Sequence, residues 1–256
     1  MEIFHALVLG VVEGITEFLP ISSTGHLIIV SKWLGIDQSS VHIAFEVIIQ
    51  LAAIMAVGAN YSQKFRPRYF TLWVKVFIAF LPLALIGFIF KDQIKLLFLN
   101  AYIVPIMFII GGVIFLILEF FHKDRHVNTG CIDDINYTQA CWVGFAQIFA
   151  LVPGTSRAGS TIVGAMLVGL SRKASAEFSF LLALPVMGAV SAYELLKNYH
   201  EFSDANWTAL VIGFIVSFVA AWLTLKLFIK FLESYTFVAF GIYRILFGIL
   251  LLAILN

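Results

Sequence analysis

Six long apolar stretches constrain the fold of this 256-residue chain more than any other feature of its sequence. A helix that crosses a bilayer needs roughly 20 mostly apolar residues, within a range of about 17–25. Stretches of this kind lie between polar segments at 59–69, 91–100, 122–139, 197–206 and 231–235. We therefore predict six transmembrane helices, which run approximately over residues 40–58, 70–90, 101–121, 174–196, 207–230 and 236–255.

The composition narrows the class of protein further. Hydrophobic residues make up 61% of the chain, charged residues 12%, and the mean hydropathy is +1.00. An average soluble domain is about 45–50% apolar and about 25% charged, so an ordinary soluble enzyme and a disordered chain are excluded. A net charge of +1 provides no basic surface for nucleic acid. The only cysteines, Cys131 and Cys141, exclude a disulfide scaffold. We predict an all-α polytopic membrane protein.

Two further apolar stretches are interrupted by polar turns. Residues 3–31 contain Pro20-Ile21-Ser22-Ser23-Thr24-Gly25-His26, and residues 140–170 contain Pro153-Gly154-Thr155-Ser156-Arg157-Ala158-Gly159-Ser160-Thr161. Each half is too short to cross the hydrocarbon layer. Non-helical backbone at that depth must be covered by protein or line an aqueous cavity. We interpret both stretches as re-entrant helical hairpins; the alternative is that each crosses once as a kinked helix.

The two hairpins begin two similar halves of one membrane domain, 1–256. The turn beginning at Pro20 aligns with the turn beginning at Pro153, and Phe45–Ala52 aligns with Ala176–Ala183 at a nearly equal offset. Each half, 1–121 and 140–256, is a hairpin followed by three spans. Because the number of crossings between the hairpins is odd, they lie on opposite faces, and we predict an inverted-topology repeat.

Lysine and arginine residues predict the orientation. Under this topology one face carries Lys64, Arg66, Arg68, Lys123, Arg125, Arg172, Lys173, Lys226 and Lys230. The other face carries only Lys32, Lys91, Lys95 and Lys197. The face richer in basic residues is expected to be cytoplasmic. Both termini and the mouth of the first hairpin then face the exterior or periplasm, and the N-terminal residues do not resemble a signal peptide.

Glu13 and Glu17 lie inside the first hairpin, where a charge is costly. Four residues apart on a helix, their carboxylates share one face. Like charges so close require that one is protonated or that a cation lies between them. Because all the ligands are oxygens, Mg²⁺ or Ca²⁺ is favoured over Zn²⁺. The alternative is a neutral, hydrogen-bonded pair at a packing interface.

Arg157 lies in the second turn beside several hydroxyl groups. A guanidinium presents a fixed fork of donors that matches phosphate or carboxylate. Free N–H groups at the start of the following helix add to an anion site. We predict a site for an anionic group, with hydroxyls from Thr155, Ser156 and Thr161. The alternative is a structural ion pair between Arg157 and one of the acidic residues, which could open when an anion arrives.

The first turn supplies two candidate nucleophiles. His26 closes the turn that holds Ser22, Ser23 and Thr24. A histidine can act as general acid or base or attack phosphorus, although a lone histidine in an apolar segment is more often an interior residue with satisfied hydrogen bonds. Ser23 is the competing nucleophile, and the sequence does not decide between them.

These motifs closely resemble those of the bacterial undecaprenyl-diphosphate phosphatase family, also called the bacitracin-resistance family. Residues Glu13 to His26 are similar to its first motif, and Pro153 to Thr161 to its second. Two long motifs in the right order are specific, and the resemblance covers essentially the whole chain. One departure is Ala158, where close relatives often carry serine.

The resemblance implies hydrolysis of undecaprenyl diphosphate to undecaprenyl phosphate and inorganic phosphate, which recycles the lipid carrier for peptidoglycan synthesis. It implies a divalent cation at Glu13 and Glu17 and an active site that opens to the periplasm. Ser23 and His26 match the first motif's catalytic candidates. Ser156, Arg157 and Thr161 match the phosphate-binding set. Ser22, Thr24 and Thr155 complete our candidate substrate contacts.

A transporter or lipid flippase is the rival class. Inverted repeats with broken helices are also the architecture of alternating-access carriers, and the same charged residues would then bind a substrate or ion without cleaving a bond. A combined phosphatase and carrier-return role is also physically open. The sequence leaves open whether the chain forms a homo-oligomer.

Overall fold

The computed structural model describes residues 2–37, 39–98, 100–121, 129–197 and 206–255. Within these ranges the regular structure is helical, apart from an isolated bridge between Thr129 and Leu170. The α-helices are α1 (Ile3–Thr16), α2 (Ser23–Trp33), α3 (Ser40–Asn60), α4 (Phe70–Ile89), α5 (Lys91–Phe98), α6 (Ile103–Phe121), α7 (Tyr137–Gln147), α8 (Arg157–Leu167), α9 (Arg172–Lys197), α10 (Trp207–Leu232) and α11 (Val238–Leu255). Short 3-10 turns are η1 (Ser62–Phe65), η2 (Pro67–Tyr69), η4 (Ile132–Asp134) and η5 (Ile148–Leu151).

The six expected spans are confirmed as single long helices. The described residues contain six helices that are long and apolar enough to cross a membrane, namely α3, α4, α6, α9, α10 and α11. Their side chains expose many large apolar groups, such as Phe88, Phe120 and Leu196, each with more than three quarters of its surface accessible. A contiguous apolar surface of this kind is expected where the neighbour is lipid.

The two interrupted stretches fold as helix, turn and helix. In the first, α1 and α2 flank a turn at 17–22; in the second, α7 and η5 lead into a turn at 152–156 before α8. None of these helices exceeds 14 residues, which is too short to cross the hydrocarbon layer. Their placement as re-entrant segments stays a prediction.

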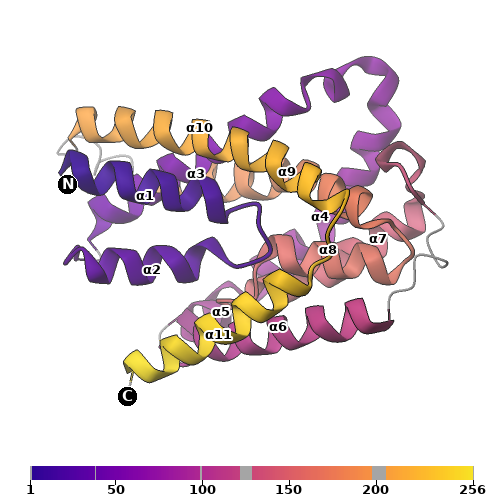
Figure 1. Ribbon diagram of the computed structural model, residues 1–256. Helices are drawn as coiled ribbons and strands as arrows, with labels where there is room; N and C mark the ends of the chain where they lie inside the picture. Colours follow the sequence, from indigo (N-terminus) through magenta and orange to yellow (C-terminus); the bar gives the residue numbers. More distant parts are fainter. Residues whose placement is uncertain (1, 38, 99, 122–128, 198–205, 256) are drawn as a thin grey trace.

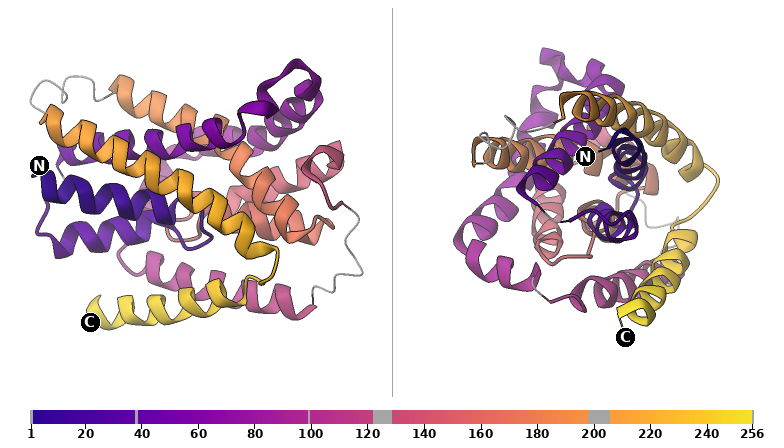
Figure 2. Two further views of the ribbon diagram at one scale, coloured as in Figure 1. Left: turned by 45° about the horizontal axis from the view of Figure 1, so that its top comes forward. Right: turned by 90° about the vertical axis from the view of Figure 1, so that its left-hand side faces the viewer.

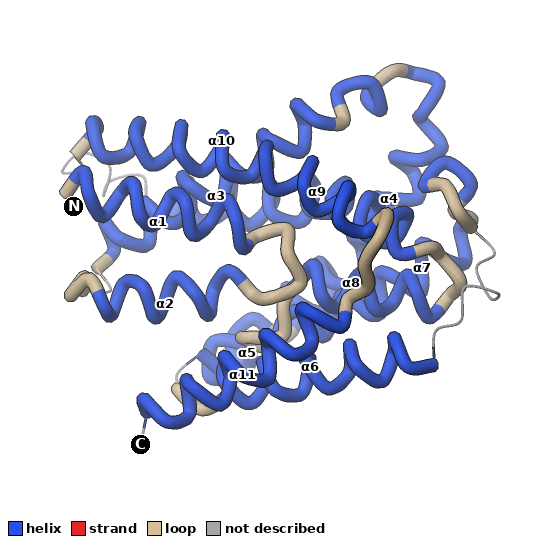
Figure 3. The backbone as a smooth tube through the Cα atoms, in the orientation of Figure 1, coloured by secondary structure: helices blue, strands red, loops and turns tan. Residues whose placement is uncertain are grey.

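The hairpins enter the bundle from opposite ends, so that their turns meet near its middle. Figure 1 shows α1 and α2 with their outer ends at the left and α7 and α8 with theirs at the right. Both turns are visible as loops at the centre of Figure 3. In the end-on view of Figure 2, α1 and α2 lie inside a ring that includes α10, α11 and the purple to magenta helices α4–α6. The middle of the protein is therefore built from loop residues and surrounded by long apolar helices.

Small residues let the hairpins and spans approach closely. A Cβ added at Gly14 of α1 would lie 2.6 Å from the Ser217 carbonyl oxygen of α10. A Cβ at Gly112 of α6 would lie 2.6 Å from the Gly241 carbonyl oxygen of α11. Such contacts are typical of helix packing in membranes, where close backbone approach replaces the hydrophobic effect as the main attraction.

The two ends of the bundle differ in charge. The end at the start of α9 and the end of α10 carries Lys64, Arg66, Arg68, Arg172, Lys173, Lys226 and Lys230, and we call it the basic end. Lys123 and Arg125 of the predicted count lie outside the described residues. Figure 1 places both termini at the opposite end, which we call the terminal end. Ion pairs join the helices at the basic end, among them Arg172 with Glu119 at 2.6 Å.

The structure adds two features that the sequence did not predict. The segment after α4, expected to be only a polar loop, contains the amphipathic helix α5. The backbone also relates the two turns differently from the sequence alignment. Ser22 and Ser156 are the only described residues other than glycine with positive φ, at 67° and 76°, and each precedes the second helix of its hairpin. The sequence alignment of Pro20 with Pro153 pairs Ser22 with Thr155, whereas the backbone conformation pairs Ser22 with Ser156, one residue further on.

Candidate active site

The first turn brings an acid and a hydroxyl together. Glu17 follows the last residue of α1, and Ser23 is the first residue of α2. The left-handed backbone at Ser22 reverses the chain between them, and Ser23 Oγ donates a hydrogen bond of 2.6 Å to Glu17 Oε2. Only 4% of the Glu17 side chain is exposed. A buried carboxylate that accepts a hydrogen bond from a serine hydroxyl can act as a general base toward that hydroxyl.

The second turn places Arg157 against the same carboxylate. Arg157 is the first residue of α8, and its Nη2 donates a 2.8 Å hydrogen bond to Glu17 Oε1. Its Nη1 donates to the Ser179 carbonyl oxygen of α9 at 3.0 Å, while Nε is buried without a partner. Ser156 caps α8 by accepting a hydrogen bond from the Gly159 N–H. The two hairpins are thus joined by a buried ion pair, as one of the sequence interpretations proposed.

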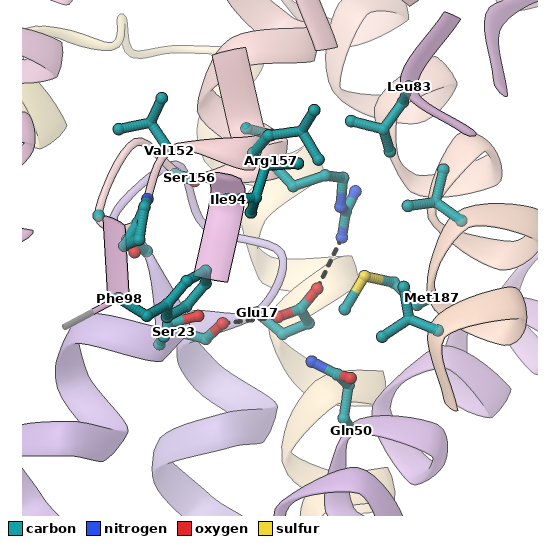
Figure 4. A pocket seen from close by; sticks show the side chains of 18 residues that line it. Glu17, Ser23, Gln50, Leu83, Ile94, Phe98, Val152, Ser156, Arg157 and Met187 are labelled. Carbon is teal, nitrogen blue, oxygen red and sulfur yellow. Dashed lines mark hydrogen bonds and ion pairs between the residues drawn. The ribbon is translucent and has the colours of Figure 1, made fainter. Parts of the chain in front are cut away.

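A pocket of about 260 Å³ lies between the two turns. Figure 4 shows Ser23, Glu17 and Arg157 joined by dashed lines, with apolar side chains such as Leu83, Met187 and Phe98 around them. The remaining lining residues are Ser22, Thr24, Gln50, Ile94, Ala150, Leu151, Val152, Pro153, Gly154, Ser156, Val186 and Val190. The polar groups come mainly from the turns, and the apolar ones from α4, α5, α9 and the segment 150–153 at η5 and the second turn. A ligand with a charged head and an apolar tail matches this division.

Two helices begin at this pocket. The first N–H groups of a helix carry partial positive charge and bind anions. At α2 the residue before the helix, Ser22, provides no side-chain cap, whereas at α8 the Ser156 hydroxyl caps Gly159. The start of α2 therefore keeps N–H groups that an anion could satisfy, and Thr24 at this position is exposed and lines the pocket.

Glu13 lies one helical turn before Glu17 and does not line the pocket. Its side chain is fully buried, and neither carboxylate oxygen has a hydrogen-bond partner. An orphaned buried carboxylate beside a second acid is the kind of donor set that a hard divalent cation would complete. The described residues contain no group of three acidic, histidine or cysteine side chains that could bind a metal. Any further ligands would therefore be substrate or water oxygens, which is usual for Mg²⁺.

The structure places three other sequence candidates outside the pocket lining. His26 Nε2 contacts the Tyr243 hydroxyl of α11 at 2.6 Å, and its Nδ1 contacts the Ser22 carbonyl oxygen of the first turn at 2.8 Å. Thr161 is fully buried, and its hydroxyl shares a 2.6 Å hydrogen bond with Ser179, which in turn holds Arg157. The hydroxyl of Thr155 is buried without a partner. His26 thus contacts the first turn through Ser22, and Thr161 contacts Ser179, which binds Arg157.

Sequence reasoning missed two residues of the site, Gln50 and Ser179. Gln50 of α3 lines the pocket and is drawn near Glu17 in Figure 4. Ser179 of α9 binds the Arg157 guanidinium through its carbonyl oxygen. Both lie in the repeated stretches after the hairpins, in spans that carry other polar residues such as Glu46 and Glu177. The shared position is the available signal, but an uncharged amide or hydroxyl among several polar residues is too common in a span to be selected by itself.

Comparison with known proteins gives one consistent result. The family model described as bacitracin resistance protein BacA matches residues 6–250. The chain is 61% identical over 254 residues to undecaprenyl-diphosphatase 2 of Pseudoalteromonas translucida, covering 99% of each chain. It is 60% identical over 257 residues to undecaprenyl-diphosphatase of Sulfurimonas denitrificans and 59% identical over 255 residues to that of a Sulfurovum species, each covering 100% of both chains.

Proposed function

Since this chain belongs to the bacitracin resistance protein BacA family and is an undecaprenyl-diphosphatase, we propose that its reaction takes place in the pocket between the two hairpin turns. The reaction hydrolyses undecaprenyl diphosphate to undecaprenyl phosphate and inorganic phosphate. One observation carries the assignment to this pocket: Ser23, Glu17 and Arg157 are hydrogen-bonded in series. In this proposal the series supplies a hydroxyl nucleophile, a base and a phosphate-binding cation in a pocket that also has apolar walls.

The shape of the pocket supports a lipid diphosphate as substrate. The diphosphate would lie between the turns, where Arg157, Ser156 and the start of α2 offer positive groups and donors. The polyprenyl chain would lie along the apolar side chains of α4, α5 and α9, such as Leu83, Ile94 and Met187. Because the polyprenyl chain comes from the lipid layer and not from water, van der Waals contact with these side chains, and not the hydrophobic effect, would hold it there.

Ser23 is the nucleophile that the geometry favours. Its Oγ would form a bond to the terminal phosphorus while the bond from that phosphorus to the bridging oxygen breaks, so that undecaprenyl phosphate leaves with the electron pair. Glu17 would take the Ser23 proton, as their 2.6 Å hydrogen bond allows. Glu17 would pass this proton to the departing undecaprenyl phosphate oxygen and so become a carboxylate again. It would then take a proton from the water molecule that attacks the phosphoserine, and that proton would return to Ser23 Oγ as inorganic phosphate is released. His26 faces away from the pocket, so we assign it a supporting role.

Arg157 would change partners during this sequence. In the described structure it neutralises Glu17, which would keep that carboxylate a weak base. A phosphate carries more charge than a carboxylate and matches the same fork of donors, so substrate would compete for the guanidinium. Arg157 would then stabilise the negative charge on the transferring phosphoryl group, and Glu17 would be free to accept the serine proton.

We propose that Glu13 and Glu17 hold a divalent cation, Mg²⁺ or Ca²⁺. The support is the orphaned and fully buried Glu13 carboxylate one turn from Glu17. When bound, such a cation would neutralise charge on diphosphate oxygens. Without it, Glu13 must be protonated to remain buried with no partner.

The protein is a multi-pass membrane protein, and we propose that its pocket opens to the exterior or periplasm. The basic end would be cytoplasmic by the positive-inside rule. The outer wall of the pocket comes from α5, which follows the terminal end of α4, and from Val190 in the last part of α9. Both lie toward the terminal end. The hairpins would then be re-entrant from opposite faces.

Phosphate release from undecaprenyl diphosphate by detergent-purified protein tests this proposal. We expect release that a chelator abolishes and that the Glu17→Ala and Arg157→Ala variants lose while remaining folded. Asp133→Asn, which alters an ion pair at the basic end, is the matched control and should keep full activity. No release by folded wild-type protein with Mg²⁺, Ca²⁺ or Mn²⁺ would instead move these residues to a transport site.

A further inference from the structure

Arg244 of α11 is buried completely and is not explained by the reaction outlined above. Its guanidinium does not contact the pocket, and no ion pair joins it to a carboxylate in the described part of the chain. A buried cation without an anionic partner is expensive, so it persists only where its hydrogen bonds are indispensable. The position of those hydrogen bonds indicates what the residue does.

All four hydrogen bonds of Arg244 go to backbone carbonyl oxygens. Nε donates to Phe108 at 3.3 Å and Nη2 to Met107 at 2.9 Å, which fixes the guanidinium on α6. Nη1 donates to Pro20 at 3.0 Å, and Nη2 also donates to Gly154 at 3.0 Å. One planar side chain therefore binds both hairpin turns at once.

The two carbonyls that it binds are equivalent in the two halves of the molecule. Pro20 lies two residues before Ser22, and Gly154 lies two residues before Ser156. Ser22 and Ser156 are the two serines with left-handed backbone, a conformation that costs free energy and persists only where the surroundings hold it. Directly after them come Ser23 and Arg157, the two groups that face each other across Glu17.

We propose that Arg244 is a positioning residue that holds the two turns in register, and so sets the distance between Ser23 and Arg157. Only arginine offers donors in a rigid fork that can reach carbonyls on three segments at once; lysine offers one point of donation. The proposal rests on the pocket assignment above, since its consequence is a loss of catalysis. A displacement of about 1 Å in such an arrangement can lower a rate by 10²-fold.

A glycine on α6 makes room for this guanidinium. A Cβ built at Gly111 would overlap Arg244 Nη2 and lie 2.7 Å from Arg244 Cζ. The three atoms nearest to that Cβ all belong to the Arg244 guanidinium. Gly111→Ala should therefore push the guanidinium off its carbonyls without removing its charge. Gly58→Ala is the matched control, because a Cβ at Gly58 meets nothing within 4 Å.

The test measures kcat, KM and folded fraction for wild type, Arg244→Lys, Arg244→Met and Gly111→Ala. We expect kcat to fall about 100-fold in Arg244→Met, about 10-fold in Arg244→Lys and at least 10-fold in Gly111→Ala. KM should change by less than about 5-fold, since the apolar wall that binds the lipid does not involve Arg244. Adding Gly111→Ala to Arg244→Met should cause no further loss, because both act through one side chain.

Two further measurements separate positioning from a merely structural role. Arg172→Met breaks a buried ion pair at the basic end, so it should lose stability but keep the kcat of each folded molecule. Amide hydrogen exchange should speed up in both 17–24 and 152–157 in the Arg244 variants, and in neither turn in Arg172→Met. The exchange measurement does not depend on activity.

Wild-type kcat in folded Arg244→Met and Gly111→Ala, with unchanged exchange in both turns, would overturn the proposal. If Arg244→Met does not fold, Gly111→Ala decides: an active enzyme with normal kcat overturns the proposal, and a loss of kcat with faster exchange in both turns supports it. Absence of phosphate release by wild type would refute the proposed function instead, and the exchange result would still decide whether Arg244 holds the turns.

Discussion

The buried ion pair between Glu17 and Arg157 should make one charge-removing substitution more harmful than two. Glu17→Gln keeps the size of the side chain but leaves the Arg157 guanidinium charged, with only 10% of its side chain exposed. Removing one partner of a buried pair costs about 3–5 kcal/mol. The second substitution, Arg157→Gln, removes the charge that was left unpaired. We therefore expect the double variant to be more stable than Glu17→Gln alone.

The magnitude follows from the contacts. Glu17 accepts two short hydrogen bonds, 2.8 Å from Arg157 and 2.6 Å from Ser23. Hydrogen bonds that involve a charged group contribute about 1.5–3 kcal/mol each. Glu17→Gln should thus lose about 3 kcal/mol, and the double variant about 1–2 kcal/mol, which is a coupling of at least about 1 kcal/mol. Neither single variant nor the double variant should release phosphate, because each lacks the proposed base, the phosphate-binding cation or both. The double variant would therefore recover stability without recovering activity.

Unfolding in mixed micelles with increasing SDS, followed through the fluorescence of the five tryptophans, measures these free energies. Asp133→Asn is the control for a more exposed pair, Lys64 with Asp133 at 2.6 Å, and should lose less than about 1 kcal/mol. The reasoning is refuted if Glu17→Gln loses less than 1 kcal/mol and the two substitutions add. That result would mean that the pair is open in the resting protein.

Three other substitutions test individual contacts. Glu13→Gln should leave stability unchanged or higher, because it removes a buried carboxylate without a partner. Its phosphate release should fall to the level of chelated wild type and should not respond to added divalent cation; a normal response to the cation would contradict the cation site. Ser179→Ala should lose about 1 kcal/mol and lower kcat about 10-fold, because it removes the hydroxyl that bonds to Thr161 at 2.6 Å and lies 3.5 Å from Arg157 Nη1; normal kcat would show that this support is dispensable. His26→Gln should keep a measurable kcat, about 10-fold below wild type, since the His26 ring contacts Tyr243 and does not line the pocket. A complete loss of kcat in folded protein would instead indicate that His26 takes part in the reaction directly.

Residue type alone was enough to predict the spans and to select the polar residues of the turns. The six long helices follow from apolar length, because lipid offers backbone groups no hydrogen-bond partner and a helix satisfies them all internally. Glu17, Ser23 and Arg157 could be selected because charged and hydroxyl groups at such depth are costly without a role. The sequence also indicated that Arg157 could pair with one of the acidic residues.

Which of these groups would meet was decided by the tertiary structure. Glu13 and Glu17 look equivalent in sequence, yet Glu17 pairs with Arg157 while Glu13 is left buried without a partner. His26 and Ser23 were equal candidates, and the direction of each side chain separates them. Gln50 and Ser179 reach the site only because α3 and α9 pack beside the turns. These contacts join residues far apart along the chain, so no local pattern encodes them.

The sequence by itself thus determined a helical membrane protein with two polar turns that carry charged and hydroxyl groups, since apolar length and the cost of buried charge are properties of short segments. Only the tertiary structure decided that the turns meet, that a left-handed serine begins the second helix of each hairpin, and that one buried arginine binds both. Side-chain direction and contacts between distant segments depend on how the helices pack against one another, and that packing is a property of the whole chain.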